Sequence, residues 1–134
     1  MEPNDLTGTK VMVIDDSNTI RRTAEVFLLQ GGCSVILAED GFDALSKIID
    51  HQPDIIFIDI MMPRLDGYQT CALLRKNPQY SGTPVVMLSS KDGLFDRARG
   101  RMVGSDWYLT KPFTKDALLK AVATHAKNHS DGKK

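Results

Sequence analysis

The segment DIIFID, residues 54–59, is the most apolar strand-like run of the chain. Four consecutive apolar residues between two aspartates are typical of a central strand in a parallel sheet, because such a strand is buried on both faces. Outward from this segment, similar runs occur at KVMVID (10–15), SVILAED (34–40), PVVMLSS (84–90) and WYLTK (107–111). The chain is therefore expected to form five short strands.

Segments with helical periodicity alternate with these runs. One helix is expected within residues 17–32, where two glycines end it, and another at 68–75. Glycines weaken the helix predicted at 93–103, and Thr114 is expected to cap a last helix. The apolar residues expected to face the core are Ile20, Ala24, Phe27 and Leu28, then Phe42, Leu45, Ile48 and Ile49, and finally Ala117, Leu118, Ala121 and Val122.

This alternation predicts right-handed βαβ units and an α/β fold. The expected fold is flavodoxin-like, a (βα)5 doubly wound parallel five-stranded sheet with strand order 2-1-3-4-5. That order suits a chain of 134 residues and places the first and third strands side by side at the switch point. A single domain is expected over residues 9–128, between polar tails at 1–8 and 129–134, with no output domain attached.

Composition narrows the choice of partners and location. The chain has 17 basic and 17 acidic residues and no net charge, which argues against nucleic acid or an anionic membrane as the main partner. A polar start and the lack of an apolar run of about 20 residues predict a cytoplasmic protein without membrane insertion. Cys33 and Cys71 lack metal-ligand spacing and are expected to be buried thiols. Arg97, Arg99 and Arg101 are expected on a solvated helix face.

Polar groups stand at the ends of four predicted strands: Asp15 and Asp16, Asp59, Ser89 and Lys111. Each alone has an ordinary structural explanation, such as a helix cap or a turn. Ligands of open α/β sheets bind beyond the carboxyl ends of the strands, where the predicted order brings the three acids together. At about 4 Å and an effective dielectric of roughly 20, each pair of carboxylates repels by about 4 kcal/mol. A divalent cation is expected to neutralise them, and all-oxygen ligands favour Mg²⁺.

Asp59 is the expected nucleophile, because a carboxylate can accept a phosphoryl group as an aspartyl-phosphate. Mg²⁺ and Lys111 would balance charge during the transfer, and Ser89 would donate to the phosphoryl oxygens afterwards. A metal-dependent phosphohydrolase is one alternative, but haloacid-dehalogenase-type enzymes need a second acid at the position of Met61. A phosphorylation-independent interaction module is another. No Gly-rich loop follows the first strand, which disfavours nucleotide binding.

The pair Asp15-Asp16, the run DIMMPRLDG (59–67), Ser89 and the triplet at 111–113 resemble the receiver domain of bacterial two-component response regulators. The resemblance extends from residue 10 to about 127. It implies a switch that is phosphorylated by a histidine kinase of the chemotaxis type. Such a switch is not an enzyme, apart from catalysing its own phosphorylation and autodephosphorylation.

The resemblance also implies a role for each matching residue. Asp59 would be the phosphoacceptor, Asp16 a direct Mg²⁺ ligand and Asp15 a ligand through a bound water. The remaining implied roles are the backbone carbonyl of Met61 as a third protein ligand, Ser89 as the switch hydroxyl, Lys111 as the lysine that pairs with the acids and then with the phosphate, and a cis peptide bond before Pro112.

Longer stretches, among them VMVIDDSNTIRRTAE (11–25), are similar to the single-domain regulators of twitching motility in chemosensory systems that control type IV pili. Receivers from related chemotaxis or phototaxis systems are the alternative. Tyr108 is then expected to swing inward when Ser89 moves, which makes residues 93–127 the face that binds the output protein. Met61 and Lys91 are expected to flank the path of the hydrolytic water and to prolong the life of the phosphate.

Overall fold

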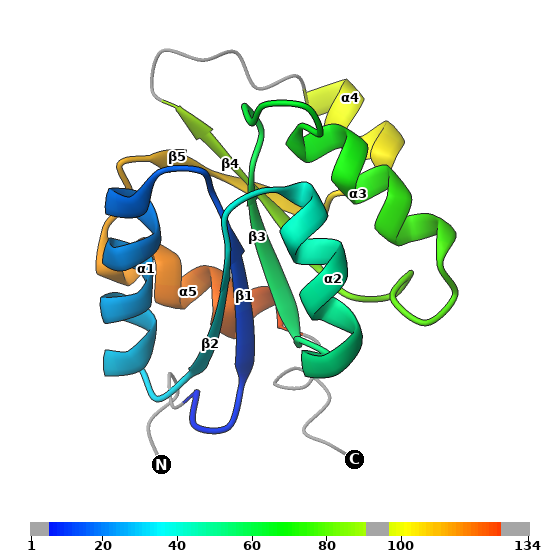
Figure 1. The fold of residues 1–134 in the computed structure, drawn as a ribbon. Coiled ribbons are helices and arrows are strands. Elements are labelled where there is room, and N and C mark those ends of the chain that lie inside the picture. The colour runs from blue at the N-terminus through cyan, green and yellow to red at the C-terminus, as the bar shows by residue number, and fades with distance from the viewer. Residues whose placement is uncertain (1–5, 91–96, 127–134) are drawn as a thin grey trace.

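Five parallel strands form one sheet with helices on both faces in the computed structural model of the chain, which describes residues 6–90 and 97–126 (Figure 1). The strands are β1 (Lys10–Ile14), β2 (Ser34–Ala38), β3 (Ile55–Asp59), β4 (Val85–Ser90) and β5 (Trp107–Lys111). The helices are α1 (Asn18–Gln30), α2 (Gly41–His51), α3 (Gly67–Lys76), α4 (Arg97–Val103) and α5 (Lys115–His125). The strand order β2-β1-β3-β4-β5 confirms the predicted flavodoxin-like fold.

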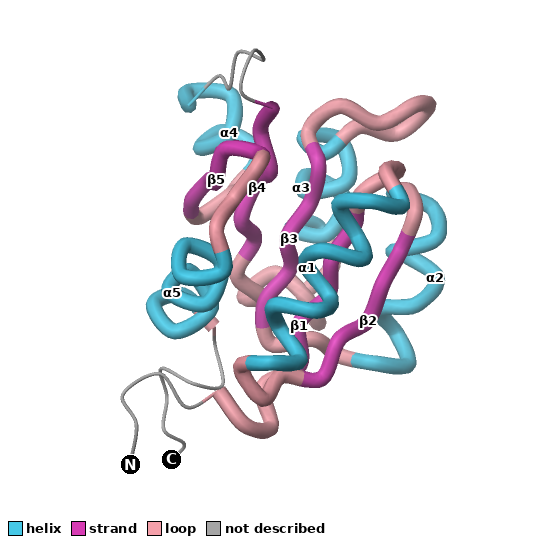
Figure 2. The backbone as a smooth tube through the Cα atoms, turned by 90° about the vertical axis from the view of Figure 1, so that its left-hand side faces the viewer, coloured by secondary structure: helices cyan, strands magenta, loops and turns pink. Residues whose placement is uncertain are grey.

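Helices lie on both sides of the sheet (Figure 2), and an apolar core fills the space between the sheet and each helix layer. On one side, Leu28 of α1 and Val122 of α5 pack in the same cluster as Phe57 of β3. On the other side, Ile48 of α2 joins the cluster that contains Ile58 of β3. Because successive residues of a strand point to opposite faces, the fully buried β3 contributes to both cores.

A capping side chain fixes the start of each of the four longer helices. The N-cap residues are Ser17 for α1, Asp40 for α2, Asp66 for α3 and Thr114 for α5, and each accepts a hydrogen bond from the N–H group three residues further along the chain. At α3 the cap is reciprocal, because Gln69 also accepts from the backbone N–H of Asp66. The helices therefore begin at defined points just beyond the strand ends.

The buried face of α2 differs from the prediction. Ile48 is buried and Leu45 packs against the core, as expected. Phe42 and Ile49, which were also expected in the core, are instead 52% and 62% exposed. Gly41 approaches α3 so closely that a Cβ atom there would lie 2.3 Å from Oγ1 of Thr70. With Gly41 held against α3, Phe42 and Ile49 lie outside the core.

The structure around α4 agrees only in part with the sequence prediction. The helix predicted at 93–103 is present as α4 from Arg97, and its first predicted residues lie outside the described residues. Arg99 does more than face solvent, since its guanidinium lies 4.3 Å from the centroid of the Tyr68 ring and 4.0 Å from the Asp66 carboxylate. Arg99 therefore packs α4 against the start of α3.

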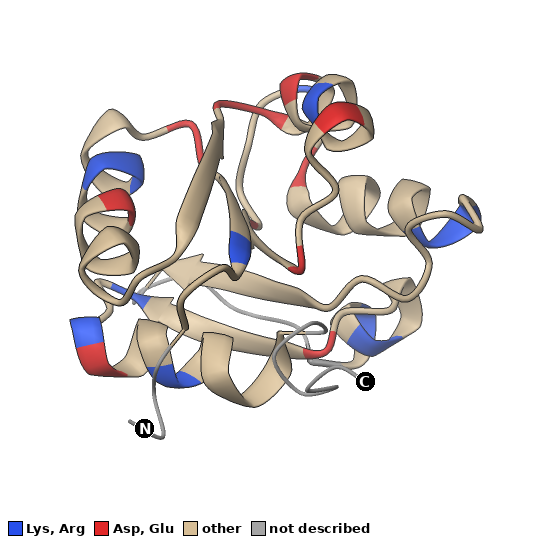
Figure 3. Ribbon diagram, turned by 90° about the horizontal axis from the view of Figure 1, so that it is seen from below, with Lys and Arg blue, Asp and Glu red and all other residues tan. Residues whose placement is uncertain are grey.

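Basic and acidic residues are interspersed over the helices in the view of Figure 3, in line with the balanced composition.

Cys33 and Cys71 are buried free thiols, as predicted, and burial raises the pKa of each to about 11. Leu6, inside the predicted N-terminal tail, is fully buried in the core beside α1 and α5. Among the described residues, none of the helices combines the length and apolar character needed to cross a membrane.

Candidate functional site

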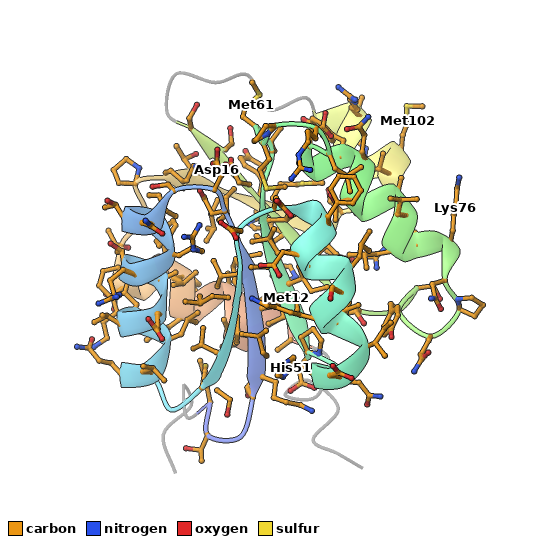
Figure 4. All side chains as sticks on the ribbon, in the orientation of Figure 1. Met12, Asp16, His51, Met61, Lys76 and Met102 are labelled. Atoms are coloured by element: carbon orange, nitrogen blue, oxygen red, sulfur yellow. The ribbon has the colours of Figure 1, made fainter. Side chains whose placement is uncertain are left out.

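Three carboxylates meet at the carboxyl end of the sheet. Asp15 and Asp16 follow β1, Asp59 ends β3, and these two strands are neighbours in the sheet. One oxygen from each carboxylate lies within 4.8 Å of the other two. Asp15 and Asp59 are buried, whereas Asp16 is exposed. Figure 4 shows Asp16 and Met61 at this end of the molecule and His51 at the opposite end.

Lys111 connects two of these acids. It ends β5, which is separated from β3 by β4, and its Nζ reaches both Oδ2 of Asp15 and Oδ1 of Asp59 at 3.1 Å. The peptide bond between Lys111 and Pro112 is cis, as the family resemblance implied. The predicted gathering of three acids and one ammonium group is therefore present in the structure.

The environment changes the proton affinities of this group. Burial, followed by repulsion from Asp15, raises the pKa of the Asp59 carboxyl from 3.8 to about 6, against the opposing effect of Lys111. Burial disfavours the charged form of Lys111, but the attraction of Asp15 and Asp59 outweighs it and keeps the pKa of Lys111 above 10.5. At pH 7.5 Asp59 is therefore mostly ionised and Lys111 is charged.

The loop after β3 keeps the backbone close to Asp59. The N–H of Met61 donates to Oδ1 of Asp59 at 3.3 Å, while the Met61 side chain is 73% exposed. Gly67, the first residue of α3, lies so near that a Cβ atom there would be 2.5 Å from the Asp59 carbonyl oxygen. Only glycine fits this position without a shift of the backbone. This steric restriction explains why the run at 59–67 ends in glycine.

The other predicted residues occupy β4 and β5. Ser89 is buried one residue beyond Leu88, which is in register with Asp59, and its hydroxyl donates to the Ser90 carbonyl at 3.3 Å. Tyr108 is half-buried on β5 and packs beside the core under α2 and α3. Lys91 lies outside the described residues.

Two arginines near the site were not predicted from the sequence. Arg21 of α1 donates to the backbone carbonyl of Asp15. Arg64, in the loop after β3, has a left-handed φ of 69° and donates to Asp40 at 3.0 Å. Its guanidinium also lies 5.2 Å from the centroid of the Phe42 ring. The exposed Phe42 thus supports the loop that follows Asp59.

The site can bind a hard cation and stabilise a transferred anion. Its metal-binding groups are carboxylate oxygens, which suit Mg²⁺ or Ca²⁺ better than thiophilic metals. The ammonium of Lys111 adds a fixed positive charge next to Asp59. A buried carboxylate with these neighbours has the chemistry needed to accept a phosphoryl group.

Comparisons with known proteins also indicate a phosphoryl-accepting signalling domain. Residues 11–123 match the Response regulator receiver domain family. Protein PilG of Pseudomonas aeruginosa is 70% identical over 118 residues, which cover 88% of this chain and 87% of that protein.

Solved structures agree in fold and in coverage. The chemotaxis protein CheY4 of Vibrio cholerae is 34% identical, with a TM-score of 0.82, over 87% of this chain and 97% of that chain. The receiver domain of the Francisella response regulator 1452 is 39% identical, with a TM-score of 0.77, over 87% of this chain and 95% of that chain. The Asp15, Asp16 and Asp59 triad fits the metal site of such domains.

Proposed function

Because the chain belongs to the response regulator receiver domain family, we propose that it accepts a phosphoryl group on Asp59 and thereby changes which protein it binds. It is a signalling protein rather than an enzyme that turns over a separate substrate, and the family implies a histidine kinase as phosphodonor. The observation that carries the proposal is the buried Asp59 carboxylate, which lies 3.1 Å from Lys111 and inside a carboxylate triad. The phosphohistidine of a cytoplasmic kinase of the chemotaxis type is the donor we assign.

In this mechanism an Asp59 carboxylate oxygen attacks phosphorus, the bond from phosphorus to the donor histidine breaks, and the imidazole leaves. Lys111 then shifts part of its attraction from the carboxylates to the phosphoryl oxygens. Asp59 must be ionised to attack, and with a pKa of about 6 it is mostly ionised at pH 7.5. The buried position excludes most water from the new acyl phosphate.

Mg²⁺ is the cation we assign to the triad. Asp16 and Asp59 would bind it directly, Asp15 would act through a water, and the backbone carbonyl of Met61 would be the third protein ligand. When bound, the cation would neutralise the clustered carboxylates and the charge on the transferred group. The all-oxygen composition of the triad supports this assignment.

Phosphorylation of Asp59 is tested by the mass of the intact protein after incubation with acetyl phosphate. The wild type should gain one phosphoryl group only when Mg²⁺ is present, and Asp59→Asn should gain none. Asp54→Asn is the matched control, because Asp54 precedes the same strand at its opposite end and accepts a hydrogen bond from the N–H of Lys10. Labelling of the Asp59 variant would mean that another residue is the phosphoacceptor, whereas no labelling of the wild type would favour the interaction-module alternative.

The similarity to Protein PilG supports a role in the chemosensory control of type IV pili and twitching motility. The wild-type chain should restore surface twitching to Pseudomonas aeruginosa that lacks PilG, and Asp59→Asn should not. The structural similarity to CheY4 supports the alternative of a chemotaxis system. Failure to restore twitching by a chain that is fully phosphorylated in vitro would favour that alternative.

We assign the output surface to α4, β5 and α5, within residues 93–127. In this proposal Ser89 turns toward the phosphoryl group and Tyr108 moves into the space that opens. Tyr108 is half-buried and packs against the core beside α2 and α3, so a further inward movement would bury more of its ring. The stretch 91–96 connects β4 with α4, which joins the Ser89 hydroxyl to this surface along the chain.

We also propose that Met61 and Lys91 slow the loss of phosphate. Met61 is apolar and offers no group to orient an attacking water, although its backbone is bonded to Asp59. Met61→Asn should shorten the half-life of the aspartyl-phosphate about 3- to 10-fold, a change of roughly 0.7–1.4 kcal/mol in the barrier. Adding Lys91→Glu should shorten it further.

The half-life is followed by the decay of the phosphorylated mass after removal of acetyl phosphate. Met102→Asn is the control, since Met102 is 84% exposed on α4. An unchanged or longer half-life in the Met61 variant would mean that this side chain has no kinetic role.

A further inference from the structure

Arg21 hydrogen-bonds to the backbone between Asp15 and Asp16, two of the acids in the candidate site. It lies in the first turns of α1, and its Nη1 donates to the carbonyl oxygen of Asp15. Its Nη2 donates to Oδ1 of Asn18 in the same helix, which fixes the direction of the guanidinium. The Asp15 carbonyl belongs to the peptide bond that leads into Asp16. The side chain of Arg21 therefore holds the peptide that connects the two acids.

The position of the Asp16 carboxylate depends on this hydrogen bond from Arg21 more than the positions of the Asp15 and Asp59 carboxylates do. Asp15 is anchored by its own carboxylate, which accepts from Ser17 N–H at 2.9 Å and from Lys111 at 3.1 Å. Asp59 accepts from Lys111 at 3.1 Å. Between the described residues, no hydrogen bond to the Asp16 carboxylate is formed, and Asp16 is exposed. Its position is therefore set mainly by the backbone on either side of it.

The charge of Arg21 would act against its geometric role. A guanidinium near a cation site repels the cation, so removal of the charge alone should tighten cation binding. Removal of the hydrogen bond to Asp15 should loosen the loop and weaken binding. The two effects have opposite signs, which allows one measurement to distinguish them.

We infer that Arg21 is a positioning residue that holds the Asp15–Asp16 peptide in the geometry needed for cation binding. This inference rests on the proposed function of the carboxylate triad as a Mg²⁺ site. It assigns Arg21 no contact with the phosphoryl group, so its effect should fall on cation affinity and not on the transfer step.

The test is a Mg²⁺ titration by isothermal calorimetry of four proteins: the wild type, Arg21→Gln, Arg21→Lys and Arg22→Gln. Loss of a group that orients a metal ligand typically weakens affinity about 10- to 100-fold, and we expect about tenfold for Arg21→Gln. Arg21→Lys should recover part of the affinity, because an ammonium can still donate to the Asp15 carbonyl. Arg22→Gln removes the same charge from the next residue, whose side chain is 79% exposed and lies 3.7 Å from Glu25.

Phosphorylation rates with acetyl phosphate provide the second measurement. The Mg²⁺ concentration for half-maximal rate should rise in Arg21→Gln, while the rate at saturating Mg²⁺ should stay close to that of the wild type. Equal or tighter Mg²⁺ binding by Arg21→Gln, or an equal loss in Arg22→Gln, would overturn the inference. A wild type that does not bind Mg²⁺ would instead overturn the proposed function of the triad.

Discussion

The Asp59 carboxylate is buried where its charge destabilises the folded protein. Asp15 lies nearby and repels it, and the Lys111 ammonium compensates only in part, so the pKa of Asp59 stands near 6. A raised carboxyl pKa means that the folded state binds a proton more tightly than the unfolded chain does. Reactivity at this residue is therefore obtained at the expense of stability, as long as no cation is bound.

In the absence of Mg²⁺, the contribution of the Asp59 carboxyl to the free energy of unfolding should therefore decrease as the pH rises. The Asp59 contribution is fully favourable below about 3.8 and is lost as the pH rises through about 6. Asp59→Asn should therefore stabilise the metal-free protein at pH 7.5, by roughly 1 kcal/mol after the lost contact with Lys111 is counted.

Urea denaturation at pH 7.5 and at pH 4.5, with EDTA present, measures this effect. The difference between Asp59→Asn and the wild type should shrink at the lower pH, where the wild-type carboxyl is protonated in the folded state. Asp54→Asn, at the opposite end of the same strand, is the control for loss of a carboxylate. A less stable Asp59→Asn protein at pH 7.5 would mean that the Lys111 contact outweighs the cost of burial.

At the scale of elements, α3 holds the end of α4 and the start of β5 through one side chain. Arg75 donates from Nε to the Gly104 carbonyl at 2.9 Å and from Nη1 to the Thr83 carbonyl at 2.6 Å. Its Nη2 reaches Asp106, which also accepts from the N–H of Val85 at the start of β4. Arg75 therefore joins α3, β4 and the turn before β5 at the end of the sheet away from the acids.

Arg75→Ala should lower the free energy of unfolding by about 2–4 kcal/mol, because it leaves the Gly104 and Thr83 carbonyls without their donor. Arg75→Lys should lose less, since one hydrogen bond can be kept. Arg101→Ala, an exposed arginine on α4, should change stability by less than about 0.5 kcal/mol. Chemical denaturation of the three variants measures these differences, and equal losses at positions 75 and 101 would contradict the assigned role of Arg75.

At the scale of the whole molecule, the acids and the proposed output face meet along β5. Lys111 ends this strand at the acidic site, and Trp107 begins it at the other end with 53% of its surface exposed. The Trp107 ring lies 5.8 Å from the ring of Tyr108 and 6.0 Å from that of His125 on α5. Movement of Tyr108 would therefore change the surroundings of the single tryptophan of the chain.

Beryllofluoride with Mg²⁺, an analogue of the phosphorylated state, should therefore produce a saturable change in Trp107 fluorescence. Ser89→Ala should still be phosphorylated but should show a much smaller change, because the proposed switch hydroxyl is missing. Asp59→Asn is the control for direct effects of the additive. An emission spectrum that stays constant in the wild type while the protein is fully loaded would rule out coupling through Tyr108.

The topology and the acidic triad could be predicted from the sequence because each strand is a short apolar run that ends in a polar group. Parallel strands bring those ends to one edge, so residues far apart in sequence could be placed together. The exposure of Phe42 could not be predicted, since it depends on how closely Gly41 approaches α3. The contacts of Arg21 and Arg75 are hidden for another reason. The contacts that define their roles are made to backbone carbonyls, which every residue has, so no residue type marks them.

Cys33 and Cys71 belong to different cores, one on each side of the sheet. A thiol reacts as the thiolate, and a pKa near 11 together with burial keeps both groups protonated and covered in the folded protein. An alkylating reagent can then reach each cysteine only when its own layer of helices opens. The alkylation rates of Cys33 and Cys71 therefore report separately on the opening of the two helix layers. Equal rates would indicate that both layers separate from the sheet together, and unequal rates that one opens before the other.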